Sequence, residues 1–303
     1  MAHERVALCL VDASNDFQLL LRNEAELQAR RSQVRLEVHH TGHDLVAQIR
    51  LVRGLIASEP PSAILILAAF DHGLGLVARE AARVGTSFVF LNRTEDDLEE
   101  LRREAQPGCS VFTVCADEAE TGRVQGRQLL RLLPRKGLVL YVQGSTRSVA
   151  ARDRTSGMRD STRGAPFDGD LIEAGWTRAE ARSAVAKWFR IVSKGGLAVD
   201  LVSSQNDQIA LGVLDALQDV ASETGRPELA RIPVCGCDGT PQLGQTLVRE
   251  RRLLATVVLP RSSGPAVEAV ARLLRDGAVP PPISTLKATS FPAESTLQPL
   301  PPA

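Results

Sequence analysis

The chain has 303 residues, of which 44% are hydrophobic and 24% are charged, and its 36 acidic residues balance its 36 basic ones. A net charge of zero argues against nucleic acid or an anionic membrane surface as a partner, because both attract basic proteins. The longest apolar runs, such as AILILAAF (63–70), are much shorter than the roughly 20 residues of a membrane-spanning helix, so we expect no membrane span.

The chain start and the cysteines bear on the cellular compartment. The first residues, MAHER, lead directly into VALCLV without the long apolar core and small-residue cleavage site of a signal peptide. We therefore expect a cytoplasmic protein, or a periplasmic one if an export signal has been trimmed. Of the five cysteines, Cys9, Cys235 and Cys237 lie in strand-like runs and are expected to be buried structural thiols.

Strand-like and helix-like patterns alternate from the start of the chain. We expect strands at residues 6–11, 34–40, 63–70, 87–93 and 111–115, and helices at residues 17–31, 44–59, 75–85 and 120–134. Strands and helices that alternate with short links predict a parallel sheet with helices on both faces.

The same alternation then begins again. We expect strands at residues 137–144, 170–176, 198–205, 232–239 and 255–260, and helices at residues 151–162, 179–194 and 209–221. The last stretch, 278–303, contains one expected strand followed by a segment that we expect to be too rich in proline to fold. The fold class is therefore α/β, with two similar open sheets of parallel strands.

Several expected strands end in polar or aromatic residues. They are Ser14, Asn15, Phe17, Asp71, His72, Asn92, Arg93, Gly144, Ser145, Arg152, Arg154, Trp176, Asn206, Asp207 and Asp238. Ligands of open α/β sheets bind at the carboxyl ends of the strands, so these residues are the candidates for a binding site. If the two sheets face each other, the two sets would line one cleft.

Six segments carry a family resemblance. They are LVDASNDF (10–17), FLNR (90–93), AARDRTSGM (150–158), QNDQIALGVLDAL (205–217), CDGTPQ (237–242) and LLATVVLP (253–260). In their order and approximate spacing they resemble type I periplasmic binding proteins, the ribose/galactose-binding and LacI-like sugar-sensing group. The resemblance covers nearly all of residues 5–290. It implies two Rossmann-like lobes, joined by a three-segment hinge, that close around a sugar or polyol.

The resemblance also implies where the chain crosses between the lobes. The crossings are placed near Cys115 and Ala116, near Pro260 and near Lys287. The N-terminal lobe is then expected to comprise residues 1–115 plus 260–286. The C-terminal lobe comprises residues 116–259 plus 287–303, including the proline-rich tail.

Five residues of the first lobe correspond to ligand-binding positions of the family. The resemblance implies that the Asn15 amide binds a hydroxyl and that Phe17 packs on one face of the sugar ring. Gln18 stands where a second aromatic residue is common. Asn92 and Arg93 stand where sugar binders usually carry Asp-Arg, which argues against a simple pentose.

Five residues of the second lobe correspond in the same way. The resemblance implies that Arg154 clamps ring oxygens, that Trp176 covers the opposite ring face, and that Asn206 and Asp238 accept hydrogen bonds from hydroxyls. Leu259 occupies a place where many sugar binders carry Gln. Taken with the missing aromatic, this predicts a sugar or polyol with an apolar edge or a different ring pattern. Arg154 could alternatively lie on a solvated helix face.

The chemistry of sugars supports these residue types without the resemblance, but simpler roles remain open. A sugar has polar edges and two faces of C–H groups, so it needs aromatic faces together with fixed donors and acceptors. However, Asn206 and Asp207 could cap the following helix, and Asp238 could be a turn residue. Trp176 and Phe17 could be core residues.

Three other signals compete with this interpretation. The segment GLGLVA (73–78) matches a dinucleotide-binding pattern, which leaves an NAD-dependent oxidoreductase as the alternative function, although no acidic residue follows the next strand. His39, His40 and His43 could supply metal ligands but are better explained by a polar loop, and no nucleophile elbow is present. We expect neither cofactor nor metal, and a non-enzymatic receptor for transport or signalling whose ligand is a sugar or polyol.

Overall fold

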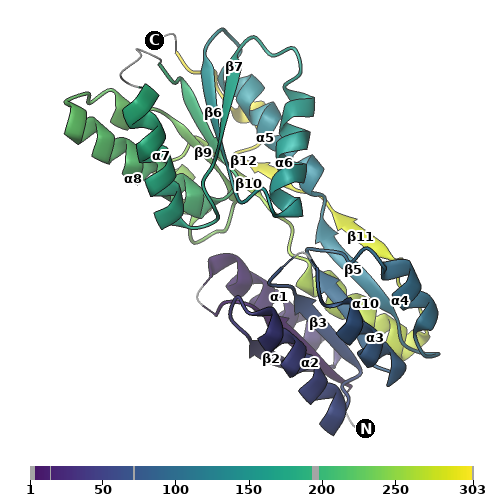
Figure 1. Ribbon diagram of the computed structural model, residues 1–303. Helices are drawn as coiled ribbons and strands as arrows, with labels where there is room; N and C mark the ends of the chain where they lie inside the picture. Colours follow the sequence, from purple (N-terminus) through teal and green to yellow (C-terminus); the bar gives the residue numbers. More distant parts are fainter. Residues whose placement is uncertain (1–3, 14, 71, 193–197, 302–303) are drawn as a thin grey trace. The chain divides into compact units, whose positions relative to one another are not determined.

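The computed structural model describes residues 4–13, 15–70, 72–192 and 198–301, which divide into two compact units (Figure 1). The first unit comprises residues 1–116 and 260–286, and the second comprises residues 117–259 and 287–303. Ala116 is the last residue of a strand in the first unit, so the expected boundary at residue 115 is one residue too early.

The first unit contains a six-stranded parallel sheet with the strand order β11-β5-β4-β3-β1-β2. Its elements are β1 (Arg5–Leu10), α1 (Asp16–Ser32), β2 (Arg35–His40), α2 (Leu45–Ser58), β3 (Ala63–Leu67), α3 (Gly75–Arg83), β4 (Ser87–Leu91), α4 (Leu98–Glu104), β5 (Val111–Ala116), α10 (Ser263–Asp276) and β11 (Ile283–Leu286).

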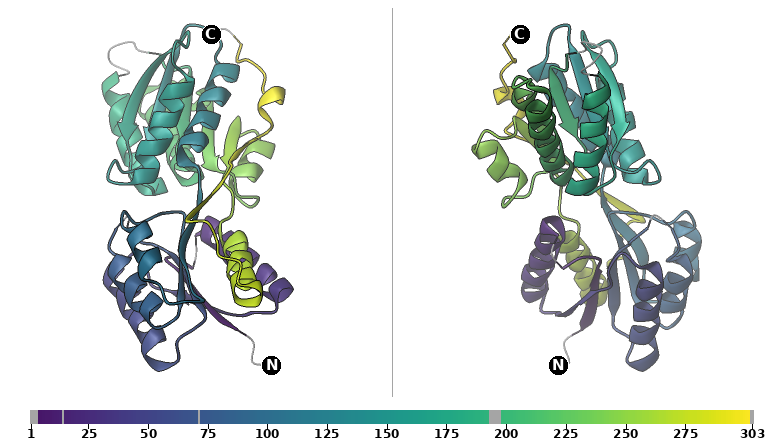
Figure 2. Two further views of the ribbon diagram at one scale, coloured as in Figure 1. Left: turned by 90° about the vertical axis from the view of Figure 1, so that its right-hand side faces the viewer. Right: turned by 60° about the vertical axis from the view of Figure 1, so that its left-hand side comes forward.

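Both faces of this sheet are covered by helices, as Figures 1 and 2 show. Because side chains alternate along a strand, β1 directs Val6 and Leu8 to a core shared with α1 and α10. Ala7 and Cys9 face the opposite core, which β1 shares with α2, α3 and α4. Strands buried on both faces therefore read as the continuous apolar runs seen in the sequence.

The second unit repeats this architecture with the strand order β12-β10-β9-β8-β6-β7. Its elements are α5 (Glu118–Leu132), β6 (Leu138–Gln143), α6 (Val149–Ser161), β7 (Asp168–Glu173), α7 (Arg178–Val192), β8 (Leu201–Ser204), α8 (Asp207–Thr224), η2 (Leu229–Arg231), β9 (Val234–Asp238), α9 (Gly244–Arg249), β10 (Ala255–Val258), β12 (Thr289–Phe291) and η3 (Glu294–Thr296). Helices α7 and α8 pack on one face, and α5 packs on the other.

Helices α4, α9 and α10 were not predicted from the sequence, and all strands were expected to be parallel, whereas β12 runs antiparallel to β10. Several expected strands also extended too far at their carboxyl ends, because the residues after β3, β4 and β8 lie in loops at the carboxyl edge of the sheet. Residues 193 and 194 of one expected helix lie outside the described residues.

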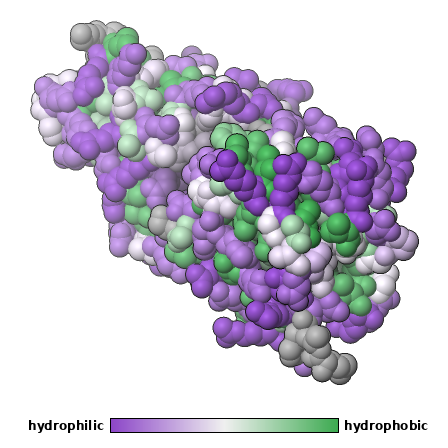
Figure 3. Space-filling view, turned by 60° about the horizontal axis from the view of Figure 1, so that its bottom comes forward, coloured by the Kyte–Doolittle hydropathy of each residue, from purple (hydrophilic) through white to green (hydrophobic). Residues whose placement is uncertain are grey.

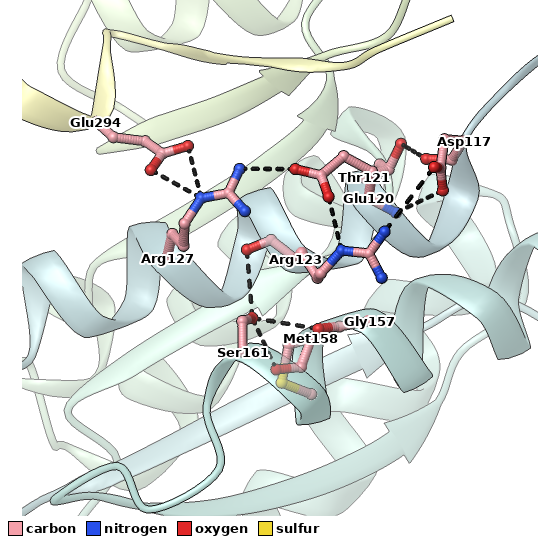
Figure 4. Close-up of polar contacts among 9 residues, drawn as sticks. All are labelled: Asp117, Glu120, Thr121, Arg123, Arg127, Gly157, Met158, Ser161 and Glu294. Atoms are coloured by element: carbon pink, nitrogen blue, oxygen red, sulfur yellow. Dashed lines mark hydrogen bonds and ion pairs between the residues drawn. The ribbon is translucent and has the colours of Figure 1, made fainter. Parts of the chain in front are cut away.

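The proline-rich tail is folded, so the expectation of an unfolded end was wrong. After β12, the Leu297 side chain is buried in the core formed with α5, and the Leu300 amide donates to the Leu132 carbonyl at 2.8 Å. Figure 4 shows that Arg127 of α5 lies between Glu120 and the Glu294 carboxylate of the tail, at 3.0 and 2.9 Å. The proline content wrongly indicated an unfolded segment, because the pairing of β12 with β10 and the burial of Leu297 attach it to the second unit.

Helices α5 and α6 are joined by polar contacts as well as by apolar ones. In Figure 4 the Ser161 hydroxyl of α6 lies at hydrogen-bonding distance from the Arg123 carbonyl of α5, at 3.3 Å.

No helix within the described ranges is long and apolar enough to cross a membrane. On the face drawn in Figure 3, hydrophilic residues predominate and apolar residues lie between them, which is ordinary for a protein surface.

Candidate functional site

In the first unit, the loop after β1 is held by its own side chains. Asn15 caps α1, because its Oδ1 accepts a hydrogen bond from the backbone N–H of Gln18 at 3.1 Å. The Gln18 side chain is 7% exposed, and its amide oxygen accepts from the backbone N–H groups of Val11 and Asp12 at 2.8 and 2.9 Å. The fold therefore uses the Gln18 oxygen to shape the loop. Ser14 lies outside the described residues.

Phe17 and Asn92 are also tied to the fold of the first unit. Phe17 is half-buried and packs against the core between the sheet and α10. This contact supports the core role that the sequence left open for Phe17. Asn92 follows β4 with a φ of 63° and accepts a hydrogen bond from the Ser262 hydroxyl at 2.7 Å. The half-buried Arg93 comes directly after it. Ligand contacts by these residues stay predictions.

In the second unit, Arg154 lies inside the protein and not on a solvated helix face. The residue as a whole is 5% exposed. Its Nε donates to Glu118 Oε2 at 2.6 Å, and its Nη1 donates to the Gln205 carbonyl at 2.6 Å. Burial alone would lower the pKa of Arg154, but the Glu118 carboxylate raises the pKa above its ordinary value. The guanidinium is therefore a fixed positive charge.

Trp176 lies directly beside this charge. The Arg154 guanidinium carbon is 5.8 Å from the centre of the Trp176 ring, within cation–π range. The ring also covers Gly144, where a Cβ atom would overlap it, so the close approach requires glycine after β6. Asn206 donates to the Trp176 carbonyl at 3.1 Å and accepts from the Ile209 amide at 2.6 Å. Its helix-capping role is confirmed, and the same side chain anchors the loop that carries Trp176.

Asp238 and Leu259 are neighbours at the ends of adjacent strands. Asp238 ends β9 with a φ of 100°, and its carbonyl accepts from the Leu259 amide at 3.1 Å. Leu259, which directly follows β10, is 7% exposed. Because β10, β9, β8, β6 and β7 lie side by side in this order, their carboxyl ends place Leu259, Asp238, Asn206, Gly144 and Trp176 along one edge of the sheet.

Asp207 does not cap the helix, contrary to one of the roles left open for it. It is the first residue of α8, but its side chain turns away from the helix end. Its Oδ2 accepts from the Gly239 amide and its Oδ1 from the Thr256 hydroxyl, both at 2.8 Å. The carboxylate thus joins the loop after β9 to β10.

Two residues near this edge were missed by the sequence analysis. Glu118 balances the buried Arg154, and no local pattern marks it because 36 residues separate the two. Gln205 is completely buried. Its side chain accepts from the Gly144 amide at 3.0 Å and donates to the Ala151 carbonyl at 2.9 Å. Its place between strand β8 and Asn206 was the available signal, since a polar residue next to a buried strand needs hydrogen-bond partners.

Two backbone donors of the glycine loop at residues 73–78 are already engaged by a side chain of the protein. The Leu74 amide at the start of α3 donates to Glu95 Oε1 at 2.9 Å, and the Glu95 side chain is largely buried. Burial raises the pKa of Glu95 above its ordinary value, and the backbone N–H groups of Leu74 and Gly73 lower it. A dinucleotide phosphate would have to displace this carboxyl group. Asp71 lies outside the described residues.

Three cysteines are buried, and the described histidines belong to no group that could hold a metal ion. Cys9, Cys235 and Cys237 are buried free thiols, as predicted, and burial raises the pKa of Cys9 and Cys235 to about 12. They are therefore neutral thiols and poor nucleophiles at neutral pH. In the part of the chain that the structure describes, no group of three or more His, Cys, Asp or Glu residues could hold a metal ion.

Chemically, the edge of the second sheet combines three kinds of group. A buried guanidinium lies against an aromatic ring, an aspartate ends a neighbouring strand, and a leucine adjoins that aspartate. An aromatic face with fixed charged groups can bind a neutral ring that carries hydroxyls. The same set contains no nucleophile–base pair among the described contacts.

Comparisons with known proteins identify the family and the fold of the chain. Residues 6–260 match the family described as periplasmic binding protein domain. The galactofuranose-binding protein YtfQ of Escherichia coli is 21% identical over 290 residues, which cover 94% of this chain and 87% of that protein. A periplasmic solute-binding protein from Actinobacillus succinogenes with bound D-allose superimposes with a TM-score of 0.80 at 18% identity, over 94% of this chain and 96% of the other.

A third comparison extends the likeness to a polyol binder. The Caulobacter myo-inositol binding protein bound to myo-inositol has a TM-score of 0.78 at 18% identity, over 95% of this chain and 93% of the other. The TM-scores show that the two α/β units together have the fold of these structures. The chain therefore belongs to the periplasmic binding protein domain family and has its two-lobed type I fold.

Proposed function

We propose that this protein is a non-enzymatic solute-binding protein that recognises a sugar or polyol and acts as a receptor for transport or signalling. The observation that carries the proposal is the pairing of Arg154 with Trp176 at the strand edge that also bears Asp238. The Trp176 ring would cover a C–H face of the ligand, and Asp238 would accept from its hydroxyls. The Nη2 group of Arg154 would donate to its oxygens, while Nε and Nη1 hold the side chain in place.

The relatives support the ligand class. Proteins similar to this chain are named or crystallised as binders of galactofuranose, D-allose and myo-inositol. These ligands share a ring with several hydroxyl groups and no net charge. We extend this class to the present chain, and with it a first-unit contribution from Asn15, Phe17, Asn92 and Arg93.

Two residues favour a ligand with an apolar edge. Leu259 places a hydrocarbon side chain beside Asp238, so an additional hydroxyl there would lose its water without gaining a partner. Asn92 carries no charge, and its Oδ1 already accepts from Ser262, which weakens its capacity to hold two adjacent hydroxyls. A deoxy sugar or a methyl sugar would suit this combination better than a simple pentose.

Ligand-dependent closure of the two units, a transporter or signalling partner, and the compartment belong to the same proposal. A ligand shifts the units toward a closed state only by binding that state more tightly. Small-angle scattering with and without the ligand tests closure, because closure lowers the radius of gyration. Fractionation of cells that express the full-length gene tests whether the protein is cytoplasmic or periplasmic.

The direct test is a thermal-melt screen of the purified protein. The compounds are D-ribose, D-allose, D-galactose, L-rhamnose, L-fucose, myo-inositol and NAD. A compound at about one hundred times its Kd should add about 2.7 kcal/mol to the free energy of unfolding. Asp238→Ala should abolish the shift, whereas Asp276→Ala, at the exposed end of α10, should retain it. A shift with NAD alone, or with none of the sugars and polyols, contradicts the proposal.

A further inference from the structure

The backbone at Asp238 has an unusual conformation. Its φ of 100° lies in a region that residues with a side chain rarely adopt. Residues held in such regions persist only where the surrounding structure fixes them, and they occur preferentially at functional sites. The contacts that hold Asp238 therefore decide where its carboxylate points.

The peptide unit between Asp238 and Gly239 is held at both ends. The Asp238 carbonyl accepts from the Leu259 amide at 3.1 Å, and the Gly239 amide donates to Asp207 Oδ2 at 2.8 Å. Because a peptide unit is planar, fixing its two ends fixes the plane next to the Asp238 Cα atom. The fixed plane restricts the ψ angle of Asp238 and so helps to set the direction of its Cα–Cβ bond.

Asp207 is itself enclosed by the protein. Its side chain is 1% exposed, and its second oxygen accepts from the Thr256 hydroxyl at 2.8 Å. A Cβ atom at position 236, which is glycine, would overlap Asp207 Oδ1. A buried carboxyl group close to another carboxylate is unfavourable unless its hydrogen bonds compensate. These bonds end on the loop and the strand that flank Asp238.

We propose that Asp207 is a positioning residue, whose carboxyl group holds the peptide unit after Asp238 and thereby aims the Asp238 side chain at the ligand. This inference rests on the proposed function, because it assumes that Asp238 contacts a sugar or polyol. Asp207 acts through Asp238 and need not touch the ligand.

Asp200 offers a matched control in the same unit. It directly precedes β8, whereas Asp207 closely follows that strand. Its Oδ2 accepts from the Leu138 amide at 2.9 Å and its Oδ1 from Arg135 at 3.0 Å. Like Asp207, which accepts from the Thr256 hydroxyl and from the backbone N–H groups of Gly239 and Thr240, it accepts both side-chain and backbone hydrogen bonds, but at the amino end of the sheet, away from Asp238.

The binding experiment compares Asp207→Asn, Asp200→Asn, Asp238→Asn and the double variant Asp207→Asn/Asp238→Asn by calorimetric titration. The probes are D-allose, D-galactose, L-rhamnose and myo-inositol. Asp207→Asn should weaken binding about tenfold or more, while Asp200→Asn should change it by less than about twofold. In the Asp238→Asn background, Asp207→Asn should cost almost nothing further, since the group that it positions is gone. The inference is overturned if the losses of binding free energy from Asp207→Asn and Asp238→Asn add up in the double variant. It is also overturned if Asp207→Asn and Asp200→Asn weaken binding equally.

A second experiment does not depend on the ligand. Hydrogen exchange of individual amides, followed by NMR, should show that Asp207→Asn accelerates exchange at Gly239 but not at Leu138. Asp200→Asn should do the reverse. If the wild-type protein binds none of the four probes but Gly239 responds in this way, the proposed function fails and the positioning contact stands. Unchanged exchange at Gly239 in Asp207→Asn overturns the inference.

Discussion

Arg154 and Glu118 form a largely buried ion pair, with Nε and Oε2 2.6 Å apart and side chains 6% and 13% exposed. The pair joins the first turn of α5 to the middle of α6. It also fixes the guanidinium that lies beside Trp176. The same contact therefore serves the stability of the second unit and the geometry of the candidate site.

The first prediction removes one partner of this pair. Glu118→Gln leaves the buried charge of Arg154 without its counter-ion, so the free energy of unfolding should fall by about 3 kcal/mol. Urea unfolding followed by circular dichroism measures the change. Glu120→Gln is the control, because Glu120 lies two residues further along α5 in a more exposed pair with Arg123. It should cost less than about 1 kcal/mol. If both substitutions lower the free energy of unfolding by the same small amount, the buried pair does not stabilise the second unit.

The contrast between these two glutamates shows how far sequence reasoning reaches. The apolar runs predicted most strands and helices, because strands buried on both faces leave a clear pattern. Helix α10 was overlooked although its sequence, SGPAVEAVARLLRD, is amphipathic. The strand-end rule selected Arg154, Trp176 and Asp238, which the structure places near one another. It could not find Glu118, because that contact joins two helices far apart in the chain.

Backbone geometry was equally hidden in the sequence. Nothing in the run VCGCDG indicates that Asp238 has a positive φ or that Asp207, over thirty residues earlier, accepts from Gly239. The residue types at Asn206 and Asp207 suit helix caps equally well, yet only Asn206 caps. Which of two adjacent polar residues faces the loop depends on tertiary packing that local propensity does not encode.

The second prediction concerns the contact between Gly144 and Trp176. Gly144→Ala introduces a Cβ atom into the Trp176 ring, so the ring must move, and the free energy of unfolding should fall by about 1–3 kcal/mol. In a Trp188→Phe background, Trp176 fluorescence reports the displacement as a red shift, and binding of the sugar found in the melt screen should weaken. Gly169→Ala on the adjacent strand β7 meets no atom within 4 Å and should leave the emission unchanged. Identical spectra for both variants would refute the close packing.

The third prediction is a pH dependence that comes from Asp207. Burial, then the nearby Asp238 carboxylate, raise the pKa of Asp207 above its ordinary value of 3.8. Below that value the side chain is protonated in both folded and unfolded states, and its contribution to stability is fully present. As the pH rises from 3.8 toward the folded pKa, the unfolded state ionises first, so this contribution declines. Asn at position 207 cannot ionise.

The measurement is the difference in the free energy of unfolding between wild type and Asp207→Asn from about pH 3 to about pH 8. This difference should fall as the pH rises. Asp219→Asn is the control of opposite sign, since the hydrogen bond from Arg182 lowers the pKa of Asp219 and its contribution grows with pH. A difference for Asp207→Asn that rises with pH would show that Asp207 is readily ionised in the folded protein.

The fourth prediction tests the attachment of the proline-rich tail. Leu297 is 8% exposed and packs with Leu129 and Leu132 of α5, so Leu297→Ala removes buried methyl groups and should destabilise the second unit by about 2 kcal/mol. Leu27→Ala on α1 is the control, because Leu27 is 49% exposed, and its effect should stay within about 0.5 kcal/mol. Urea unfolding measures both. A tail that only frays would make the two substitutions equivalent, whereas a folded tail makes Leu297, which directly follows η3, part of the core of the second unit.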